Sequence, residues 1–169
     1  MGALRTVAEM MEIAARTAPK AKGEDFVVTR IIEGDELRAL ADAMHARGSS
    51  TNDKGFIRDG GNTANSEVVL LIGIKDAKPA GLNCGACGQE RCIQINTLDD
   101  EFAGPQCPYR LLDMGIALGS AAKMASILNA DSRIMYRIGS SAREIKLIDA
   151  DFVMGIPLSA TGKSIYFDR

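Results

Sequence analysis

Tryptophan is absent from the sequence, only one histidine occurs, and aromatic residues make up 5% of the 169 positions. The one histidine, His45, stands near the end of a charged helical stretch, where we expect a solvated side chain. Metal sites built from several histidines are thereby excluded. A surplus of basic residues is also missing, since the net charge is -2. This charge balance argues against nucleic-acid binding, which depends on a basic surface.

Long hydrophobic runs and targeting signals are missing as well. The most apolar stretch, residues 111–128, contains Asp113 and Lys123, whereas a membrane span requires a long apolar run with few charges. The N-terminus carries Glu9 and Glu12 within a helical pattern instead of the apolar centre of a signal peptide. The sequence therefore predicts a cytoplasmic protein that does not enter membranes. In that compartment cysteines serve as ligands or redox thiols more often than as disulfides.

The sequence does contain enough apolar residues, 46%, to build the core of one domain over residues 1–169. Its hydrophobic periodicity predicts helices and a few strands that do not alternate strictly, which is typical of an α+β domain in two or three layers. The expected strands are residues 26–32, 68–74 and 152–156, with the second one central because it is apolar throughout. The expected helices are one that ends before Pro19, one that is capped by Asp35 and ends at Gly48, one that starts at Pro108, and short ones capped by Asp131 and Ser141. Residues 49–66 are expected to form a polar loop.

The helix that follows Pro108 carries apolar residues on nearly every side. Such a helix is expected to be buried, either in the core or at a subunit interface. Gly115 and Gly119 lie one turn apart and leave one side flat enough for another backbone or for a planar ligand. We therefore expect a homodimer built on residues 111–128.

All four cysteines fall within residues 75–107, where both helical and strand periodicity fail. Cys84, Cys87, Cys92 and Cys107 have the spacing C-x2-C-x4-C-x14-C. Three thiolates on one loop can hold three corners of a cubane cluster, and a later cysteine can hold the fourth. Nearby glycines let the backbone curl around a cluster, and Cys107 opens a helix whose positive end favours an anionic group. We therefore predict one [4Fe-4S] cluster on these cysteines, and with it electron transfer.

Other interpretations of the cysteines remain open at this point. A zinc ion would accept four thiolates and make this a non-catalytic domain with a structural site, although zinc ribbons usually pair their cysteines as two C-x2-C units. A redox disulfide between Cys84 and Cys87 would leave the other two cysteines unused. No general acid, base or nucleophile stands out, so the sequence assigns no reaction, and an oxidoreductase is the only enzyme class it suggests.

The cysteine segment resembles known iron–sulfur domains. Residues 84–92 together with Cys107 and Pro108 are similar to the four-cysteine [4Fe-4S] domains of membrane electron-transport complexes and of corrinoid iron–sulfur proteins. The whole chain resembles a family of small prokaryotic proteins that contain a ferredoxin domain. Residues 3–25, the cysteine loop and residues 155–169 carry this second resemblance.

A further resemblance is to the flavin-dependent nitroreductase fold. Residues 14–19 are similar to the first flavin-lining segment of that family, residues 115–120 to its central helix at the dimer interface, and residues 152–157 to its closing strand. The resemblance implies a small mixed or antiparallel sheet covered by helices, into which residues 75–107 are inserted as a cysteine-rich loop.

The same resemblance implies FMN as a second cofactor. The residues to which it would assign flavin binding are Arg16, Lys20, Lys22 and Gly119. The alternative function is then an FMN-dependent reductase in which the cluster relays electrons. The paired arginines that bind the flavin phosphate in that family have no counterpart here, so flavin binding would be altered or lost.

Overall fold

A four-stranded antiparallel sheet with the strand order β1-β2-β6-β5 forms the middle of the fold. The structure is a computed structural model that describes residues 2–92 and 98–167. The strands of this sheet are β1 (Val27–Glu33), β2 (Val68–Ile74), β6 (Phe152–Ser159) and the two-residue β5 (Asp131–Ser132). Every residue of β2 is buried, as expected for an apolar strand with a neighbour on each side and helices on both faces.

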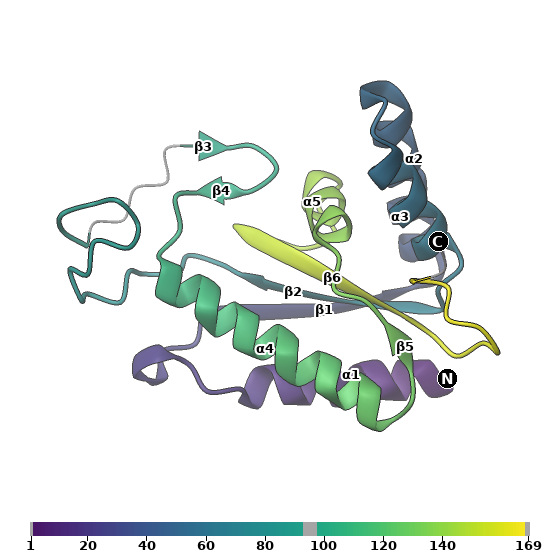
Figure 1. The fold of residues 1–169 in the computed structure, drawn as a ribbon, viewed down its shortest axis with the longest axis horizontal. Coiled ribbons are helices and arrows are strands. Elements are labelled where there is room, and N and C mark those ends of the chain that lie inside the picture. The colour runs from purple at the N-terminus through teal and green to yellow at the C-terminus, as the bar shows by residue number, and fades with distance from the viewer. Residues whose placement is uncertain (1, 93–97, 168–169) are drawn as a thin grey trace.

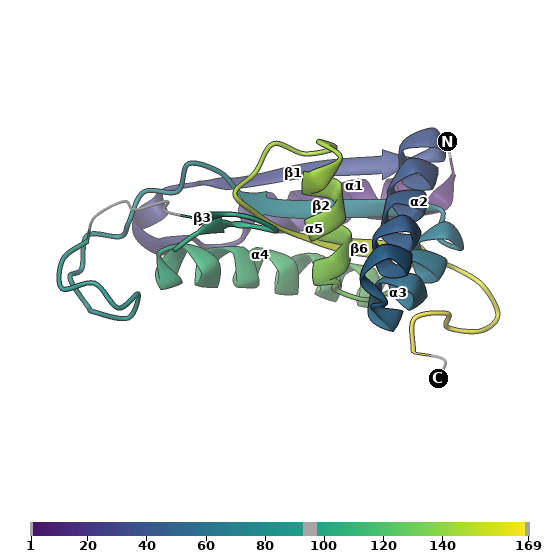
Figure 2. The same ribbon diagram turned by 90° about the horizontal axis from the view of Figure 1, so that it is seen from above.

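Helices cover the two faces of this sheet (Figures 1 and 2). On one face α1 (Ala3–Thr17) and α4 (Pro108–Ile127) pack side by side, with buried alanines that allow a close approach. On the other face lie α2 (Gly34–Thr51), α3 (Lys54–Ala64) and α5 (Tyr136–Glu144), which share a second hydrophobic core. The predicted α+β architecture, with an antiparallel sheet covered by helices, is confirmed.

The expected loop over residues 49–66 is wrong, because α3 occupies most of it. The helix escapes prediction from sequence because it is rich in glycine and polar residues, and its neighbours stabilise it. A Cβ atom at Gly60 would overlap the ring of His45 from α2, so the glycine permits the close contact. The expected helix end at Gly48 is wrong for the same reason. A Cβ there would lie 2.8 Å from Ile57 Cγ1, so Gly48 serves the packing of α2 on α3 while the helix continues to Thr51.

The three predicted helix caps are also wrong. Asp35 lies inside the first turn of α2, which begins at Gly34. Asp131 belongs to β5, where it pairs with Ser159 of β6. Ser141 lies in the middle of α5, since that helix begins at Tyr136. In each case the local motif is present, but α2 and α5 begin at other residues and the chain at Asp131 forms a strand instead of a helix.

The longest helix, α4, is buried on one side only. Leu112 and Ile127 are 59% and 60% exposed, and Ile116 is 45% exposed. A Cβ atom at Gly115 or Gly119 would meet nothing within 4 Å, so both glycines lie on this open side. The prediction that α4 is buried on all sides within the chain is therefore wrong. Its exposed side carries an apolar stripe formed by Leu112, Ile116 and Ile127. No helix within residues 2–92 and 98–167 is long and apolar enough to cross a membrane.

The segment after β6 folds back onto the second core through Tyr166. The phenol is buried, with its oxygen 2.8 Å from Ser66 Oγ, and Arg133 donates to the Tyr166 carbonyl oxygen at 3.0 Å. Burial raises the pKa of Tyr166 above its ordinary value of 10.0, because the phenolate would lose its hydration. The neutral phenol therefore stabilises the fold below the unfolded pKa, and this contribution is lost as the pH rises through the folded pKa.

Candidate metal centre

The cysteine-bearing segment leaves the sheet after β2 and returns at α4 (Figure 1, the teal loop at the left). Cys84, Cys87 and Cys92 lie on its outward half, and residues 93–97 of the predicted loop fall outside the described residues. Its returning half contains the short strands β3 (Leu98–Asp99) and β4 (Ala103–Gly104). Cys107 is the N-cap residue of α4, and its carbonyl oxygen accepts the N–H groups of Arg110 and Leu111 at 2.9 and 3.1 Å.

Tight turns shape the outward half of this segment. Gly81, Gly85 and Gly88 have φ angles of 71°, 72° and 82°, a region that glycine adopts without strain. The N–H group of Asn83 donates to Cys92 Sγ at 3.2 Å, and the Asn83 side chain accepts the N–H group of Cys92 at 2.9 Å. An N–H group directed at a sulfur is the kind of interaction that stabilises a metal-bound thiolate.

The four cysteines are free thiols, of which Cys84 is exposed and the others are half-buried. In the described parts of the chain, no three His, Cys, Asp or Glu side chains form a group that could hold a metal ion. The ligation of one metal centre by all four cysteines therefore stays a prediction. Their chemistry fits the group, because four thiol sulfurs are the donor set of both cubane clusters and four-cysteine zinc sites.

A buried arginine that the sequence analysis missed stands one turn into α4. Arg110 is 0% exposed, although arginine is normally a surface residue. Its Nε donates to the Lys78 carbonyl oxygen at 2.7 Å, and its Nη1 donates to the Ala21 carbonyl oxygen at 3.1 Å. The guanidinium also forms ion pairs with Asp113, at 3.2 Å, and with Glu24. The only signal in the sequence is an Arg and an Asp three positions apart near the start of a largely apolar helix.

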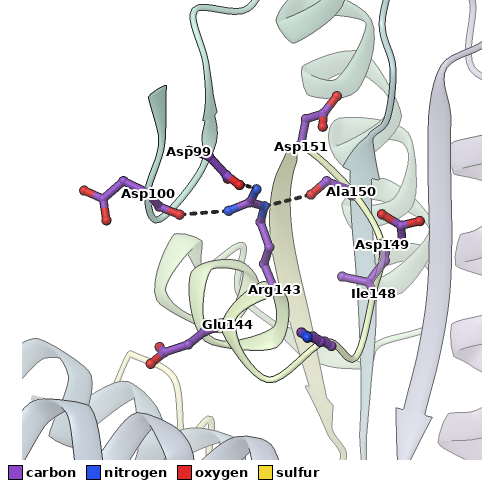
Figure 3. Close-up of a pocket in the computed structure, with 9 residues that line it drawn as sticks. Asp99, Asp100, Arg143, Glu144, Ile148, Asp149, Ala150 and Asp151 are labelled. Atoms are coloured by element: carbon purple, nitrogen blue, oxygen red, sulfur yellow. Dashed lines mark hydrogen bonds and ion pairs between the residues drawn. The ribbon is translucent and has the colours of Figure 1, made fainter. Parts of the chain in front are cut away.

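A second arginine anchors the returning half of the segment (Figure 3). Arg143, near the end of α5, donates to the carbonyl oxygens of Ala150 and Asp100 at 2.9 and 2.8 Å and pairs with Asp99. Around it lies a polar cleft of about 490 Å³ with several carboxylates, among them Glu144, Asp149 and Asp151. The contacts of Arg143 hold the β3–β4 strand pair against the end of the sheet, so we assign this arginine a structural role.

Comparison with known proteins shows the family of the chain. Residues 103–169 match the family model described as "Uncharacterized protein containing a ferredoxin domain (DUF2148)". An "Uncharacterized protein" from Archaeoglobus fulgidus is 47% identical over 169 residues, covering 98% of this chain and 91% of the relative. The chain belongs to this ferredoxin-domain family. Of the four cysteines in this ferredoxin-domain protein, the matched residues include only Cys107.

Solved structures with the same fold include nitroreductases. A putative nitroreductase in complex with FMN from Desulfovibrio desulfuricans has a TM-score of 0.60 at 13% identity, covering 97% of this chain and 78% of that one. The FMN-dependent nitroreductase NfnB from Mycobacterium smegmatis, in complex with NADPH, has a TM-score of 0.60 at 11% identity, covering 94% and 78%. At such identities the likeness concerns the fold alone. The ferredoxin-domain protein therefore has the nitroreductase-like fold that the sequence resemblance implied.

Two of the residues predicted for flavin binding make local contacts in this ferredoxin-domain protein. Arg16 pairs with Asp25 at 2.7 Å and donates to the Val27 carbonyl oxygen. Lys20 Nζ donates to the carbonyl oxygens of Arg16 and Ala18, both at 2.8 Å, so it caps the C-terminal end of α1.

The other two residues predicted for flavin lie elsewhere. Lys22 Nζ lies 3.5 Å from the position that a Cβ atom would take at Gly81, so its charge faces the cysteine segment. Gly119 lies on the open side of α4. A groove of about 320 Å³ separates the end of α1 from α4, and its lining is Ala14, Thr17, Ala18, Pro19, Ser120, Lys123, Met124 and Ile127. None of the four predicted residues is part of that lining, and their role in flavin binding stays a prediction.

Proposed function

We propose that this ferredoxin-domain protein binds one [4Fe-4S] cluster and carries single electrons. The observation behind the proposal is the placement of the cysteines: three on a loop turned by glycines and one as the N-cap residue of α4. The cluster ligands would be Cys84, Cys87, Cys92 and Cys107. When bound, a cluster of this kind supplies reversible one-electron transfer. A cytoplasmic location would keep the thiols reduced until the cluster is assembled.

The surroundings of the cysteines favour an anionic centre. Cys107 lies at the positive end of the α4 dipole, where a thiolate is stabilised. Positive potential is added near the loop that carries the other three cysteines by the N–H group of Asn83, which is directed at Cys92 Sγ, and by the ammonium group of Lys22 beside Gly81. These residues would lower the free energy of four thiolates gathered in one place.

Metal and sulfide analysis of the full chain tests the proposal. After strictly anaerobic purification we expect about four irons and about four sulfides per chain, with a visible absorption that bleaches on reduction. Zinc without sulfide or colour would contradict the proposal and support the structural four-cysteine zinc site instead. Matched aerobic and anaerobic preparations control for a cluster that oxygen destroys.

A second candidate is an FMN-dependent reductase in which the cluster relays electrons to a flavin. The fold favours it, since a solved structure with this fold is a complex with FMN. The groove between α1 and α4, with Lys123 in its lining, is the place where we would look for a bound molecule. Release of about one flavin per chain on heat denaturation would favour the reductase, and a flavin-free protein would favour the simple carrier.

We further infer that the protein is a homodimer formed through the apolar stripe of α4. Ile116→Asp, at the centre of the stripe, is expected to weaken the dimer about a hundredfold or more, because a carboxylate would lose its water at the interface. Light scattering during size-exclusion chromatography measures the mass. Ile134→Asp is the control, since Ile134 is similarly exposed (42% against 45%) but lies in the connection between β5 and α5. A monomeric wild-type protein, or a dimer that survives Ile116→Asp, would contradict the inference.

A further inference from the structure

The two ends of the cysteine-rich segment meet at one residue, Arg110. Arg110 Nε donates to the carbonyl oxygen of Lys78, which lies on the chain that leads into the Cys84–Cys92 loop. The backbone N–H group of the same residue donates to the carbonyl oxygen of Cys107 at 2.9 Å. Arg110 therefore connects the entrance of the loop with the helical turn that begins at the last cysteine.

The same guanidinium holds the loop between α1 and β1. Its Nη1 donates to the Ala21 carbonyl oxygen, and its ion-pair partner Asp113 accepts the Ala21 N–H group on Oδ1 at 2.7 Å. This loop carries Lys22, whose ammonium group lies close to the backbone of Gly81 in the cysteine segment. The loop that brings positive charge to the cysteine segment is thus held by the Arg110–Asp113 pair.

The partners of Arg110 distinguish it from an ordinary core residue. Two of its hydrogen bonds go to carbonyl groups of connecting segments and two go to the carboxylates of Asp113 and Glu24, whereas apolar side chains hold α1 and α4 on the sheet. The guanidinium also lies over the ring of Phe26, 4.7 Å from its centroid, and is shielded from water. A lysine at this position would keep the charge but lose the planar guanidinium group, which donates hydrogen bonds to several acceptors at once.

We propose that Arg110 is the positioning residue of the cysteine centre: it sets the place of the Cys84–Cys92 loop relative to Cys107. This inference rests on the proposed iron–sulfur function. A cubane cluster requires four sulfurs at fixed separations, so a loop that drifts from α4 binds the cluster less tightly. The role is indirect, because Arg110 acts through the backbone positions of the cysteine-bearing segments.

Arg110→Lys tests this role with two readouts. In the metal-free full chain, hydrogen exchange in residues 79–92 is expected to accelerate about tenfold, while β2 and β6 keep their wild-type rates. In the cluster-loaded chain, iron loss to a chelator is expected to be about tenfold faster, a typical cost of removing a group that orients metal ligands. Arg30→Lys is the control, because Arg30 also bonds a carbonyl oxygen, that of Leu147, and a carboxylate, that of Glu36, but at an exposed site on β1.

The outcomes separate this proposal from the proposed function. Wild-type exchange and wild-type iron loss in Arg110→Lys would overturn the positioning role. A wild-type protein without iron and sulfide would refute the cluster, while the exchange data would still report whether Arg110 holds the loop. Asp113→Asn is the second variant, and a smaller acceleration of both rates is expected from it. Global unfolding of both variants, seen as rapid exchange in β2, would also overturn the proposal, because the pair would then be part of the core.

Discussion

Replacing Cys92 with alanine is expected to remove iron and sulfide from the protein and leave the chain folded. Cys92 is half-buried and belongs to neither hydrophobic core, so the loss of its side chain creates no cavity there. Three remaining thiolates would leave one iron without a protein ligand, and the cluster would be open to solvent. We expect less than about one iron per chain, against about four in the wild type. The melting temperature of the metal-free variant should match that of the metal-free wild type.

Glu90→Ala is the matched control for this experiment. Glu90 is exposed on the same loop, between two of the cysteines, and it carries no thiol. It is expected to keep the iron, the sulfide and the visible absorption of the wild type. A Cys92→Ala protein with the same iron and sulfide content as Glu90→Ala would remove Cys92 from the ligand set and refute the four-cysteine cluster.

Gly139→Ala is expected to destabilise the protein strongly, although it adds only one methyl group. A Cβ atom at Gly139 of α5 would overlap the carbonyl group of Val153 in β6 and lie 2.8 Å from Met154 N. The obstacle is strand backbone, which cannot turn aside as a side chain can. Alanine gains about 1 kcal/mol in helix propensity over glycine, but separating α5 from the sheet should cost about 3 kcal/mol or more. Urea denaturation monitored by circular dichroism measures the difference.

Gly61→Ala gives the opposite expectation for the same chemical change. Gly61 also lies inside a helix, α3, but its Cβ would meet nothing within 4 Å. The free energy of unfolding should rise by about 0.5–1 kcal/mol, because alanine restricts the unfolded chain and favours the helix. A Gly139→Ala protein as stable as Gly61→Ala would show that α5 does not lie as close to β6 as the structure has it.

The candidate site could be predicted from the sequence only in part. The cysteine spacing, the absence of periodicity around it and the start of a helix at Pro108 are all readable from the sequence, because each depends on neighbouring residues. The burial of Arg110 is not readable, since its partners Lys78, Ala21 and Glu24 lie far away in sequence and meet only in the folded chain. The capping role of Lys20 likewise depends on how the chain turns after α1.

Local sequence was sufficient to predict the α+β class, the three long strands, the helices that end before Pro19 and begin at Pro108, and the cysteine-rich segment. Those features follow from apolar periodicity and from proline, which act within a few residues. The folded chain was needed to learn that α3 is a helix, that Gly48 packs instead of ending α2, and that α4 leaves one apolar side open. These outcomes depend on which surfaces meet across the sheet, and residues far apart in the sequence supply those surfaces.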